Sequence, residues 1–372
     1  MRHSMISGIR CRHFIGEKPC RFNKRCDPKN CRDFAPFGKR ILIIKLAAIG
    51  DVLRTTPILP VLKKRHPLSH ITWVTARDSI EILEGNSHID RIYTIDHTDI
   101  IRLLAESFDI LISLDKNMAA ASLASIIKAV EKKGFGSTPY GNLCIFNNAS
   151  RYSFELGFND ELKFKVNRKT YQEMIFEMCE LGDRYGEYIL TTDASDADYA
   201  KNLFKKWKIK NTDRIVGLNT GAGKVFLTKK WAEDSFIRLA EYLNGRLKTR
   251  VLLLGGLAEM DINAHIAAKA RGTVINTGNS HSIKQFAELI GLCDLIVSSD
   301  TLAMHLAIAK KIPAVALFGS TSPYEADIYG RGIKMFLNLE CSPCYKYRCD
   351  DMRCMDSLSP EMVFKACSNL LK

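Results

Sequence analysis

The stretch that most constrains the fold is residues 41–60, ILIIKLAAIGDVLRTTPILP. It begins with an unbroken apolar run, Ile41 to Ile44, which is typical of a parallel strand buried on both faces. A turn of small residues then leads to Gly50-Asp51, and a helix-like segment follows in which Pro57 predicts a kink. The sequence therefore predicts an α/β fold with a ligand crevice beyond the carboxyl end of this strand.

Asp51 allows two interpretations at this position. A carboxylate beyond a buried strand can act on a bound substrate as a catalytic base. An Asp directly before a helix is also a typical N-cap, because its side chain accepts backbone N–H bonds. Position alone favours the cap, whereas a second ligand-binding region further along the chain favours catalysis.

Short apolar runs alternate with helix-length intervals along most of the chain, which predicts parallel strands joined by crossover helices. Two such series flank a less regular segment, residues 136–212, so we expect two α/β domains with a cleft between them. Within that middle segment, residues 171–182 have a helical pattern, and the lysine-rich residues 203–214 favour a solvated linker. The predicted strands are 41–44, 71–76, 91–95, 109–115, 215–221, 250–256, 294–300 and 314–319.

Length, charge and hydropathy exclude several classes of protein. A chain of 372 residues, 46% of them hydrophobic, can build two or three packed domains, and it contains no apolar run of about 18 residues that would span a membrane. The first residues lack the apolar core of a secretory signal. The net charge is +13, and residues 1–40 hold eleven Lys and Arg against three Asp and Glu. Without a nucleic-acid motif, this basic segment favours anionic lipid or a phosphorylated sugar as partner, and a merely solubilising surface is the alternative.

The twelve cysteines fall into two clusters and four dispersed positions. Because no export signal precedes them, disulfides are not expected, and each cluster is a candidate thiolate site for zinc or iron. The tail spacing C-x2-C-x4-C-x4-C begins with the usual chelating pair, whereas the head spacing matches no standard zinc pattern. Reduced cysteines that pack two loop-rich segments are the alternative. The head cluster is Cys11, Cys20, Cys26 and Cys31, and the tail cluster is Cys341, Cys344, Cys349 and Cys354.

A Gly/Thr-rich loop, NTGAGKVFLTKKW at 219–231, lies between a predicted strand and a predicted helix. Such a loop offers backbone N–H groups and the helix dipole to an anion, and Lys224, Lys229 and Lys230 add positive charge. It lacks the Walker pattern, so phosphate binding is a weak expectation from this loop alone. Thr220 and Gly221 lie at its start.

Two further strand ends carry polar residues. Glu259 follows a Gly-Gly turn, where an acid can bind ribose hydroxyls or simply stabilise a helix start, and the local pattern favours the second role. The strand ending near residue 299 leads to Asp300 and Thr301, with His305 one turn into a helix of small residues. A hydroxyl, an imidazole and backbone N–H groups can converge there on one anion. We therefore predict a ligand site rather than a structural histidine.

Together these motifs resemble glycosyltransferase family 9, the bacterial ADP-heptose:lipopolysaccharide heptosyltransferases. The resemblance runs in consistent order over about residues 39–370, from ILIIKLAAIGDVLRTTPIL through TKKWAEDSF, GGLAE, SSDTLAMHLA and IPAVALFGSTSP to CSPCYKYRC. It implies the GT-B fold, two facing Rossmann-like domains with an intervening cleft. The implied organisation is a basic Cys-containing extension at 1–38, an acceptor domain at 39–205, a nucleotide-sugar domain at 206–335, and a Cys-containing tail with a C-terminal helix at 336–372.

The resemblance also assigns roles to residues. Asp51 matches the catalytic base, Lys229 the pyrophosphate-binding lysine and Glu259 the ribose-binding acid. The family's common D-T-G reads Asp300-Thr301-Leu302 here, and Lys230 leaves a one-residue ambiguity beside Lys229. The full donor-binding set is Thr220, Gly221, Lys229, Glu259, Asp300, Thr301 and His305, and the acceptor-binding set is Lys45, Arg54, Asp115 and Lys116.

The implied reaction is a single displacement that inverts the anomeric centre of a heptose or related sugar, carried by a nucleoside diphosphate that is expected to be ADP. Basic residues and a helix N-terminus would stabilise the leaving diphosphate, so no cofactor is expected for catalysis, and closure of the domains would exclude water. The expected acceptor is an anionic glycolipid such as the lipopolysaccharide core. The expected location is the cytoplasm, with peripheral contact at the inner membrane.

Two other functions are compatible with these residues. A sugar-nucleotide epimerase shares the two-domain architecture and would turn over the sugar nucleotide without an acceptor. A non-catalytic metal-binding protein on a degenerate transferase scaffold would explain the cysteines. An NAD-dependent oxidoreductase is disfavoured, because no G-x-G-x-x-G follows the first strand of either domain.

Overall fold

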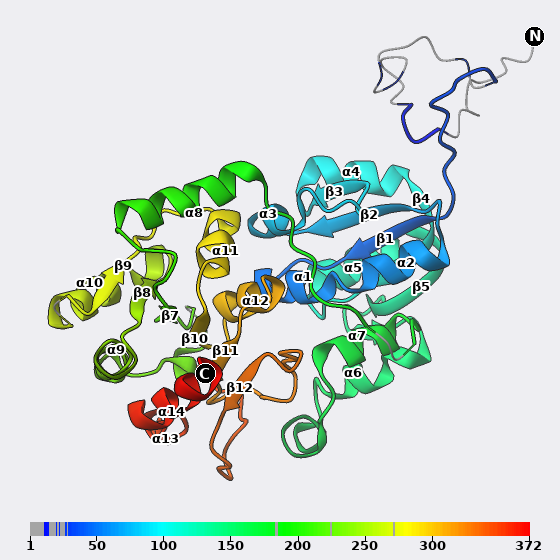
Figure 1. Ribbon diagram of the computed structural model, residues 1–372. Helices are drawn as coiled ribbons and strands as arrows, with labels where there is room; N and C mark the ends of the chain where they lie inside the picture. The colour runs from blue at the N-terminus through cyan, green and yellow to red at the C-terminus, as the bar shows by residue number, and fades with distance from the viewer. Residues whose placement is uncertain are drawn as a thin grey trace, which may run out of the picture.

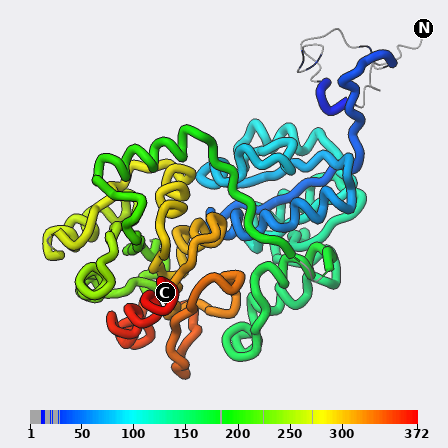
Figure 2. The backbone as a smooth tube through the Cα atoms, viewed as in Figure 1, coloured from blue at the N-terminus to red at the C-terminus, as the bar shows by residue number. Residues whose placement is uncertain are grey.

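The computed structural model describes residues 11–14, 20, 22, 27, 29–182, 185–223, 225–270 and 272–372, so Cys26 and Lys224 lie outside the described residues. The chain forms two lobes, each built on one sheet (Figures 1 and 2). The α/β fold predicted from the alternation is confirmed.

The first lobe contains a six-stranded sheet in the order β3-β2-β1-β4-β5-β6. All neighbours in it are parallel except β5 and β6, and Ile41 to Ile44 of the central strand β1 are fully buried, as the apolar run predicts. The strands are β1 (Arg40–Ile44), β2 (His70–Thr75), β3 (Arg91–Thr94), β4 (Ser107–Ser113), β5 (Lys128–Ser137) and β6 (Leu143–Ile145).

The second lobe repeats this order with its own strands, β9-β8-β7-β10-β11-β12, and all neighbours are parallel. In both lobes the order is therefore the doubly wound one, with the first strand of the lobe at the centre. The strands are β7 (Ile215–Asn219), β8 (Arg250–Leu254), β9 (Val274–Asn276), β10 (Leu295–Ser299), β11 (Ala314–Leu317) and β12 (Gly332–Met335).

Helices cover the faces of both sheets (Figure 1). Pro57 lies between α1 and α2, so the predicted kink is a complete break in the helix. The lysines of residues 203–210 are exposed as expected, but the segment begins inside α8 rather than in a linker. The helices are α1 (Ile49–Thr55), α2 (Ile58–Arg65), α3 (Ile80–Leu83), α4 (His97–Ala105), α5 (Met118–Ile126), α6 (Arg151–Glu155), α7 (Tyr171–Met178), α8 (Ala194–Lys206), α9 (Glu233–Leu247), α10 (Met260–Lys269), α11 (Ile283–Gly291), α12 (Leu302–Ala309), α13 (Arg353–Asp356) and α14 (Pro360–Leu370).

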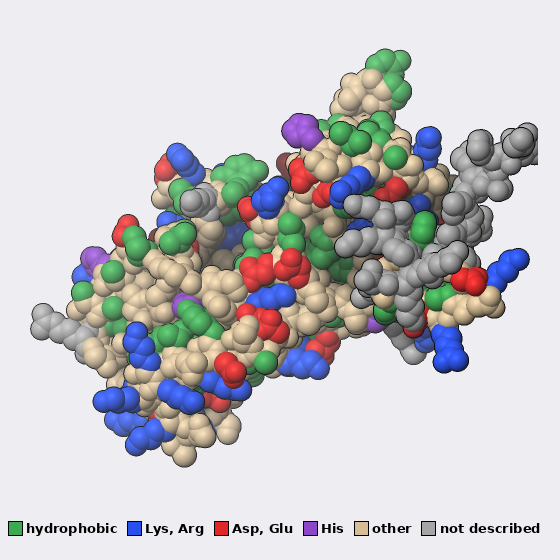
Figure 3. Space-filling view, turned by 90° about the horizontal axis from the view of Figure 1, so that it is seen from above, with side chains coloured by type: hydrophobic (Ala, Val, Ile, Leu, Met, Phe, Trp, Pro, Cys, Tyr) green, Lys and Arg blue, Asp and Glu red, His purple; other side chains and the backbone are tan. Residues whose placement is uncertain are grey.

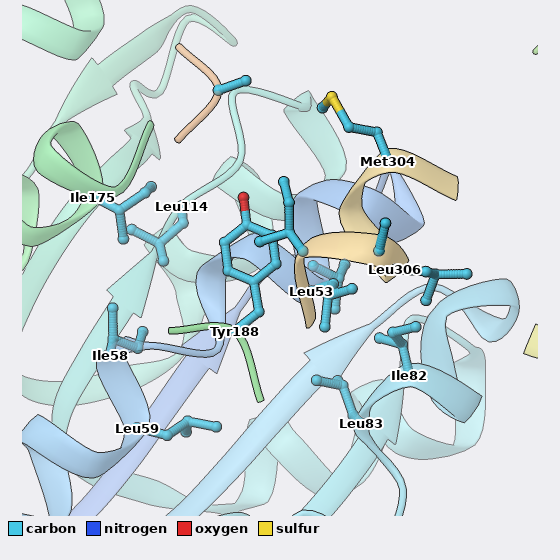
Figure 4. Close-up of a cluster of buried hydrophobic side chains, with 14 of the residues drawn as sticks. Leu53, Ile58, Leu59, Ile82, Leu83, Leu114, Ile175, Tyr188, Met304 and Leu306 are labelled. Atoms are coloured by element: carbon cyan, nitrogen blue, oxygen red, sulfur yellow. The ribbon is translucent and has the colours of Figure 1, made fainter. Parts of the chain in front are cut away.

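One hydrophobic core crosses from the first lobe to the second. In Figure 4, Tyr188 lies among side chains of both lobes, including Leu53 of α1 and Met304 and Leu306 of α12. The two helices approach so closely that a Cβ added to Gly50 would lie 2.7 Å from Cδ2 of His305. Glycine at position 50 therefore permits the contact that joins the lobes beside the cleft.

The tail after β12 belongs to the core of the second lobe. Met355 of α13 and Cys367 of α14 are fully buried, and α14 packs against α9. Within the described residues, no helix is long and apolar enough to cross a membrane. The face seen in Figure 3 carries a group of Lys and Arg side chains at one end, in keeping with the net charge of +13.

Candidate active site

The predicted site residues follow the central strands of the two sheets. Lys45, Asp51 and Arg54 come after β1, and Asp115 and Lys116 come directly after its neighbour β4. In the second lobe the loops after β7 and β10 likewise follow two neighbouring central strands. Ligands of doubly wound sheets bind at these points, where the chain leaves adjacent strands in opposite directions.

A cleft of about 590 Å³ lies between the two lobes. From the first lobe it is lined by Asp51 and Arg54, and from the second by Lys229 and the start of α12. Lys230 is exposed and does not line this cleft. Of the two adjacent lysines, only Lys229 therefore reaches the cleft. The cleft thus brings together these predicted residues: Asp51, Arg54, Lys229, Asp300, Thr301 and His305.

Asp51 lies in the first turn of α1 with its side chain 38% exposed. The N-cap of this helix is Ala48, and no side chain caps it, so the helix-cap interpretation of Asp51 is wrong. Among the described residues Asp51 forms an ion pair with Arg54, whose guanidinium lies 3.5 Å from the Asp51 carboxylate. The Asp51 carboxylate therefore lines the cleft beside Arg54 and takes no part in capping the helix.

Arg54 is buried and held from several sides. Its guanidinium donates a hydrogen bond to the backbone carbonyl of Glu325 and lies 4.1 Å from the ring centre of Tyr171. Burial alone would lower the pKa of Arg54, but the fields of Tyr188, Asp51 and Tyr171 outweigh it and raise the pKa. Arg54 thus supplies a permanent positive charge beside Asp51.

Lys229 and Asp300 form an ion pair in the wall of the cleft. The Lys229 ammonium lies 3.0 Å from both the carbonyl oxygen and Oδ2 of Asp300. Although burial opposes it, the charge of Lys229 and its hydrogen bond lower the pKa of Asp300 to about 2. Nε2 of His305 lies 3.8 Å from Oδ1 of Asp300, and burial followed by the charge of Arg54 lowers the pKa of His305 to about 4. At neutral pH the imidazole is therefore uncharged and Asp300 is ionised.

Thr301 is the N-cap residue of α12, but its side chain does not cap the helix. Its hydroxyl instead accepts a hydrogen bond from Asn219 at 3.2 Å and lies 3.0 Å from the Ser298 hydroxyl. The first N–H groups of a helix have no hydrogen-bond partner within the helix. Because the Thr301 side chain does not accept from them, these N–H groups of α12 can donate to a ligand. Together with Lys229, this end of α12 is suited to hold an anion.

A second cavity, of about 410 Å³, adjoins the cleft on the side of the first lobe. Three residues line both spaces: Asp51, Glu325 and Tyr345. The predicted acceptor residues Lys45, Asp115 and Lys116 line the second cavity, whereas the fourth, Arg54, lines the cleft. Asp51 therefore stands where a molecule in one space would meet a molecule in the other.

Two lysines in the second cavity differ in their partners. Lys45 is buried and forms an ion pair with Asp115 at 2.6 Å. Lys116 is an exposed residue as a whole, but its amino group is packed against protein and donates a hydrogen bond to the carbonyl oxygen of Ser153. Desolvation of this amino group, followed by the like charge of Lys163, lowers the pKa of Lys116 to about 8. An anionic ligand would relieve this repulsion.

The remaining predicted donor residues form a separate group at the ends of β7 and β8. A Cβ added to Gly221 would lie 2.7 Å from the carboxyl group of Glu259, and Thr220 donates a 2.6 Å hydrogen bond to Asn263. Glu259 accepts the N–H of Gly256 at 2.9 Å, which is the helix-start role that its sequence position favours. Thr220, Gly221 and Glu259 do not line the two spaces described above.

Several residues that line the site have no signal in the sequence. Tyr171 is the first residue of α7, and Lys163, Glu325 and Tyr345 lie outside the regular α-helices and strands. They reach the site because segments distant in the chain pack together across the lobes. Tyr345 lies within the motif CSPCYKYRC, but neither that motif nor the residue types of the other three indicate a place in the site, so only the folded chain reveals it.

The tail cysteines lie near one another. Burial raises the pKa of Cys354, and the fields of Cys344, Cys341 and Cys349 add to this effect. Nevertheless, no group of three or more His, Cys, Asp or Glu in the described part of the chain is placed to hold a metal ion. Of the head cluster, Cys11 is buried and pairs with Pro36 in an isolated β-bridge. Metal binding by either cluster stays a prediction.

Comparison with known sequences decides the family. The sequence model described as "Glycosyltransferase family 9 (heptosyltransferase)" matches residues 99–354. The chain belongs to glycosyltransferase family 9. The resemblance seen in the sequence is thereby confirmed, and with it the assignment of the chain as a glycosyltransferase.

Relatives and solved structures of family 9 agree with this assignment. Lipooligosaccharide heptosyltransferase 2 of Campylobacter jejuni is 27% identical in one strain, over 64% of this chain and 85% of the relative, and 32% identical in another, over 63% and 85%. The family 9 glycosyltransferase of Veillonella parvula superposes with a TM-score of 0.72 at 24% identity, over 90% of this chain and 97% of that one. The Escherichia coli ADP-heptose LPS heptosyltransferase II gives 0.67 at 17%, over 89% and 98%. The GT-B fold predicted for this family 9 chain is confirmed.

Proposed function

We propose that this family 9 enzyme transfers a heptose, with inversion, from ADP-heptose to a sugar of the lipopolysaccharide core. The observation that carries the proposal is the position of Asp51, which lines both the inter-lobe cleft and the adjoining cavity. In a single displacement, the base must reach the acceptor hydroxyl while that hydroxyl faces the anomeric carbon of the donor. The names of relatives, among them an ADP-heptose LPS heptosyltransferase, support the choice of donor and acceptor.

The second lobe is proposed to hold the donor. The diphosphate would lie between Lys229 and the N-terminus of α12, where an ammonium group and uncapped N–H groups stabilise the negative charge that grows on the leaving group. The ribose would lie toward Glu259, at the end of β8. Because these groups already supply positive charge, we propose that catalysis requires no cofactor.

The first lobe is proposed to hold the acceptor in the second cavity. Lys116 and Lys163 both line this cavity, and their like charges repel each other. An anion bound between them would relieve this repulsion, so the pair favours an anionic acceptor. An inner-core glycolipid carries such anionic groups. Asp51 would remove the proton of the attacking hydroxyl, and the neighbouring Arg54 would hold the carboxylate in place.

We also propose that the enzyme works in the cytoplasm in peripheral contact with the anionic face of the inner membrane. The net charge of +13 and the basic residues 1–40 support this contact. Co-sedimentation with vesicles of anionic lipid, compared with neutral vesicles and repeated in high salt, tests it. Equal recovery on both kinds of vesicle would contradict the proposal.

The test of the donor is a thermal-shift screen with ADP-, UDP-, GDP- and CMP-sugars. A ligand at 100 times its Kd stabilises the folded protein by about 2.7 kcal/mol, so a specific donor stands out clearly. The selected sugar nucleotide is then incubated with and without heptose-deficient lipooligosaccharide, and the anomeric configuration of the product is read by NMR. Acceptor-dependent release of ADP with inversion supports the proposal, whereas turnover without acceptor would favour an epimerase.

A further inference from the structure

Three residues line both the cleft and the second cavity, and only Asp51 has a role so far. The other two, Glu325 and Tyr345, come from the second lobe, from the loop after β11 and from the segment that carries the tail cysteines. Their position places them beside the reacting hydroxyl of the proposed acceptor. The question is what chemistry they add there.

Glu325 is fixed by its backbone and leaves its side chain to the cavity. Its carbonyl oxygen accepts hydrogen bonds from the Arg54 guanidinium and, at 3.0 Å, from the N–H of Tyr171, so two residues of the first lobe hold this backbone of the second lobe. Its carboxyl group makes no ion pair with any residue that the structure describes, and the amide of Asn167 approaches it at 3.4 Å. Burial raises the pKa of Glu325 despite the nearby charge of Arg54. The Glu325 carboxyl group thus forms no ion pair with a described residue and keeps acceptor positions for a further hydrogen bond.

Tyr345 is held by contacts from both lobes. Its N–H donates to Ser320 at 2.8 Å, and its hydroxyl accepts the N–H of Ser322 at 3.3 Å. From the first lobe, Phe164 stacks on its ring at 5.9 Å and the Lys163 ammonium lies 4.2 Å from the ring centre. Tyr345 and Glu325 line the same two spaces, and although burial raises the pKa of Glu325, interaction with the Tyr345 side chain opposes this rise. Tyr345 therefore orients Glu325 rather than neutralising it.

We propose that Glu325, oriented by Tyr345, determines acceptor specificity by accepting a hydrogen bond from the sugar hydroxyl next to the one that Asp51 deprotonates. A carboxylate has about four acceptor positions, so it can bind a hydroxyl in addition to its protein partners. A site that binds a substrate hydroxyl in this way discriminates strongly against an analogue that lacks it, because the polar group of the protein is then left unpaired. This inference rests on the proposed transfer reaction.

The test uses Glu325→Gln, which keeps the shape of the side chain and removes its charge. We expect the KM for heptose-deficient lipooligosaccharide to rise about tenfold, because the glutamine amide oxygen still accepts a hydrogen bond but a weaker, neutral one, and kcat to fall less than that. The Kd for ADP should stay within about twofold, because ADP lacks the acceptor and the transferred sugar. Tyr345→Phe should raise the same KM by a smaller factor.

Two matched controls remove the same groups outside the site. Glu340→Gln removes the charge of an exposed residue in the segment that carries the tail cysteines. Tyr347→Phe removes the hydroxyl of an exposed tyrosine in the same segment. Neither residue lines the cleft or the second cavity, so both variants should keep the acceptor KM of the wild type. An equal rise in these controls would mean a general effect on the segment and would overturn the inference.

The outcomes separate this inference from the proposed function. If the wild type transfers sugar but Glu325→Gln and Tyr345→Phe leave the acceptor KM unchanged, the specificity role is refuted and the transfer reaction stands. A rise confined to the ADP Kd would place Glu325 with the donor and likewise refute it. If the wild type binds ADP and melts cooperatively but transfers nothing to lipooligosaccharide, the proposed function fails, and the inference fails with it.

Discussion

Asp51→Asn should abolish most of the activity while leaving the fold nearly intact. The asparagine side chain has the size of the aspartate but cannot take the proton from the acceptor hydroxyl. Loss of a general base lowers kcat by roughly 10²–10⁴, which corresponds to about 3–5 kcal/mol in the activation barrier. This is the effect expected if Asp51 stands between donor and acceptor.

The structural cost of the same substitution can be estimated from the contacts of Asp51. Its ion pair with Arg54 spans 3.5 Å, and the aspartate side chain is 38% exposed, so solvent screening limits the loss to at most about 1 kcal/mol. The first-turn position on α1 adds about 0.3–1 kcal/mol of interaction with the helix dipole. No cap is lost, because Ala48 is the N-cap. A small decrease in melting temperature is therefore expected.

Three measurements on the same preparation separate the two effects. ADP release with saturating donor and acceptor gives kcat, calorimetric titration with ADP gives donor affinity, and a melting curve gives stability. We expect a large fall in kcat with ADP affinity and melting temperature close to those of the wild type. An Asn variant that turns over at more than about a tenth of the wild-type rate would refute the reasoning, since a base contributes at least about 10².

The other predictions concern the donor loop, the buried histidine and the tail cysteines. Lys229→Ala should lower kcat/KM by about 10²–10³, as for loss of one electrostatic stabiliser, whereas Lys230→Ala should have little effect; the reverse result would contradict the assignment. In unfolded chains His305 binds a proton near pH 6.5 but in the folded protein only near pH 4, so stability should fall by up to about 3 kcal/mol as pH decreases through this window. Melting curves of His305→Gln should show a smaller fall, and an unchanged pH dependence would refute the assignment. If the tail cluster binds metal, analysis of untagged, reduced protein should find one zinc or iron per chain. A metal content near zero would mean that the four cysteines of the cluster only pack in the tail: Cys341, Cys344, Cys349 and Cys354.

The central parts of the fold could be predicted because their signals are local. The apolar residues at 41–44 and 295–297 belong to strands buried on both faces, and these strands are β1 and β10. Strand β5 was not predicted, because its sequence KAVEKKGFGS is rich in lysine and glycine and has no apolar run, and because it lies next to the sheet edge. Strand identity at an edge depends on the neighbouring strand, which the sequence does not display.

The candidate site divides in the same way. Residues at strand ends, such as Asp51 and Asp300, could be proposed from sequence, because a parallel strand fixes where its carboxyl end opens. Glu325 and Tyr345 could not, since they enter the site through contacts with Arg54 and Phe164 of the other lobe. The helix-cap interpretation of Asp51 was wrong because the helix begins earlier, at Ile49, than the Gly-Asp pair indicates.

The close fit of Gly50 against His305 has a consequence for how the two halves of the molecule depend on each other. Because one apolar core runs through this contact, separating the chain between the lobes would expose aliphatic side chains of both α1 and α12 to water. The halves are thus not interchangeable modules: grafting a foreign second lobe onto this first lobe would require the graft to supply the surface that meets Gly50. We expect replacement of the loops at the strand ends to disturb this shared core less than replacement of a whole half.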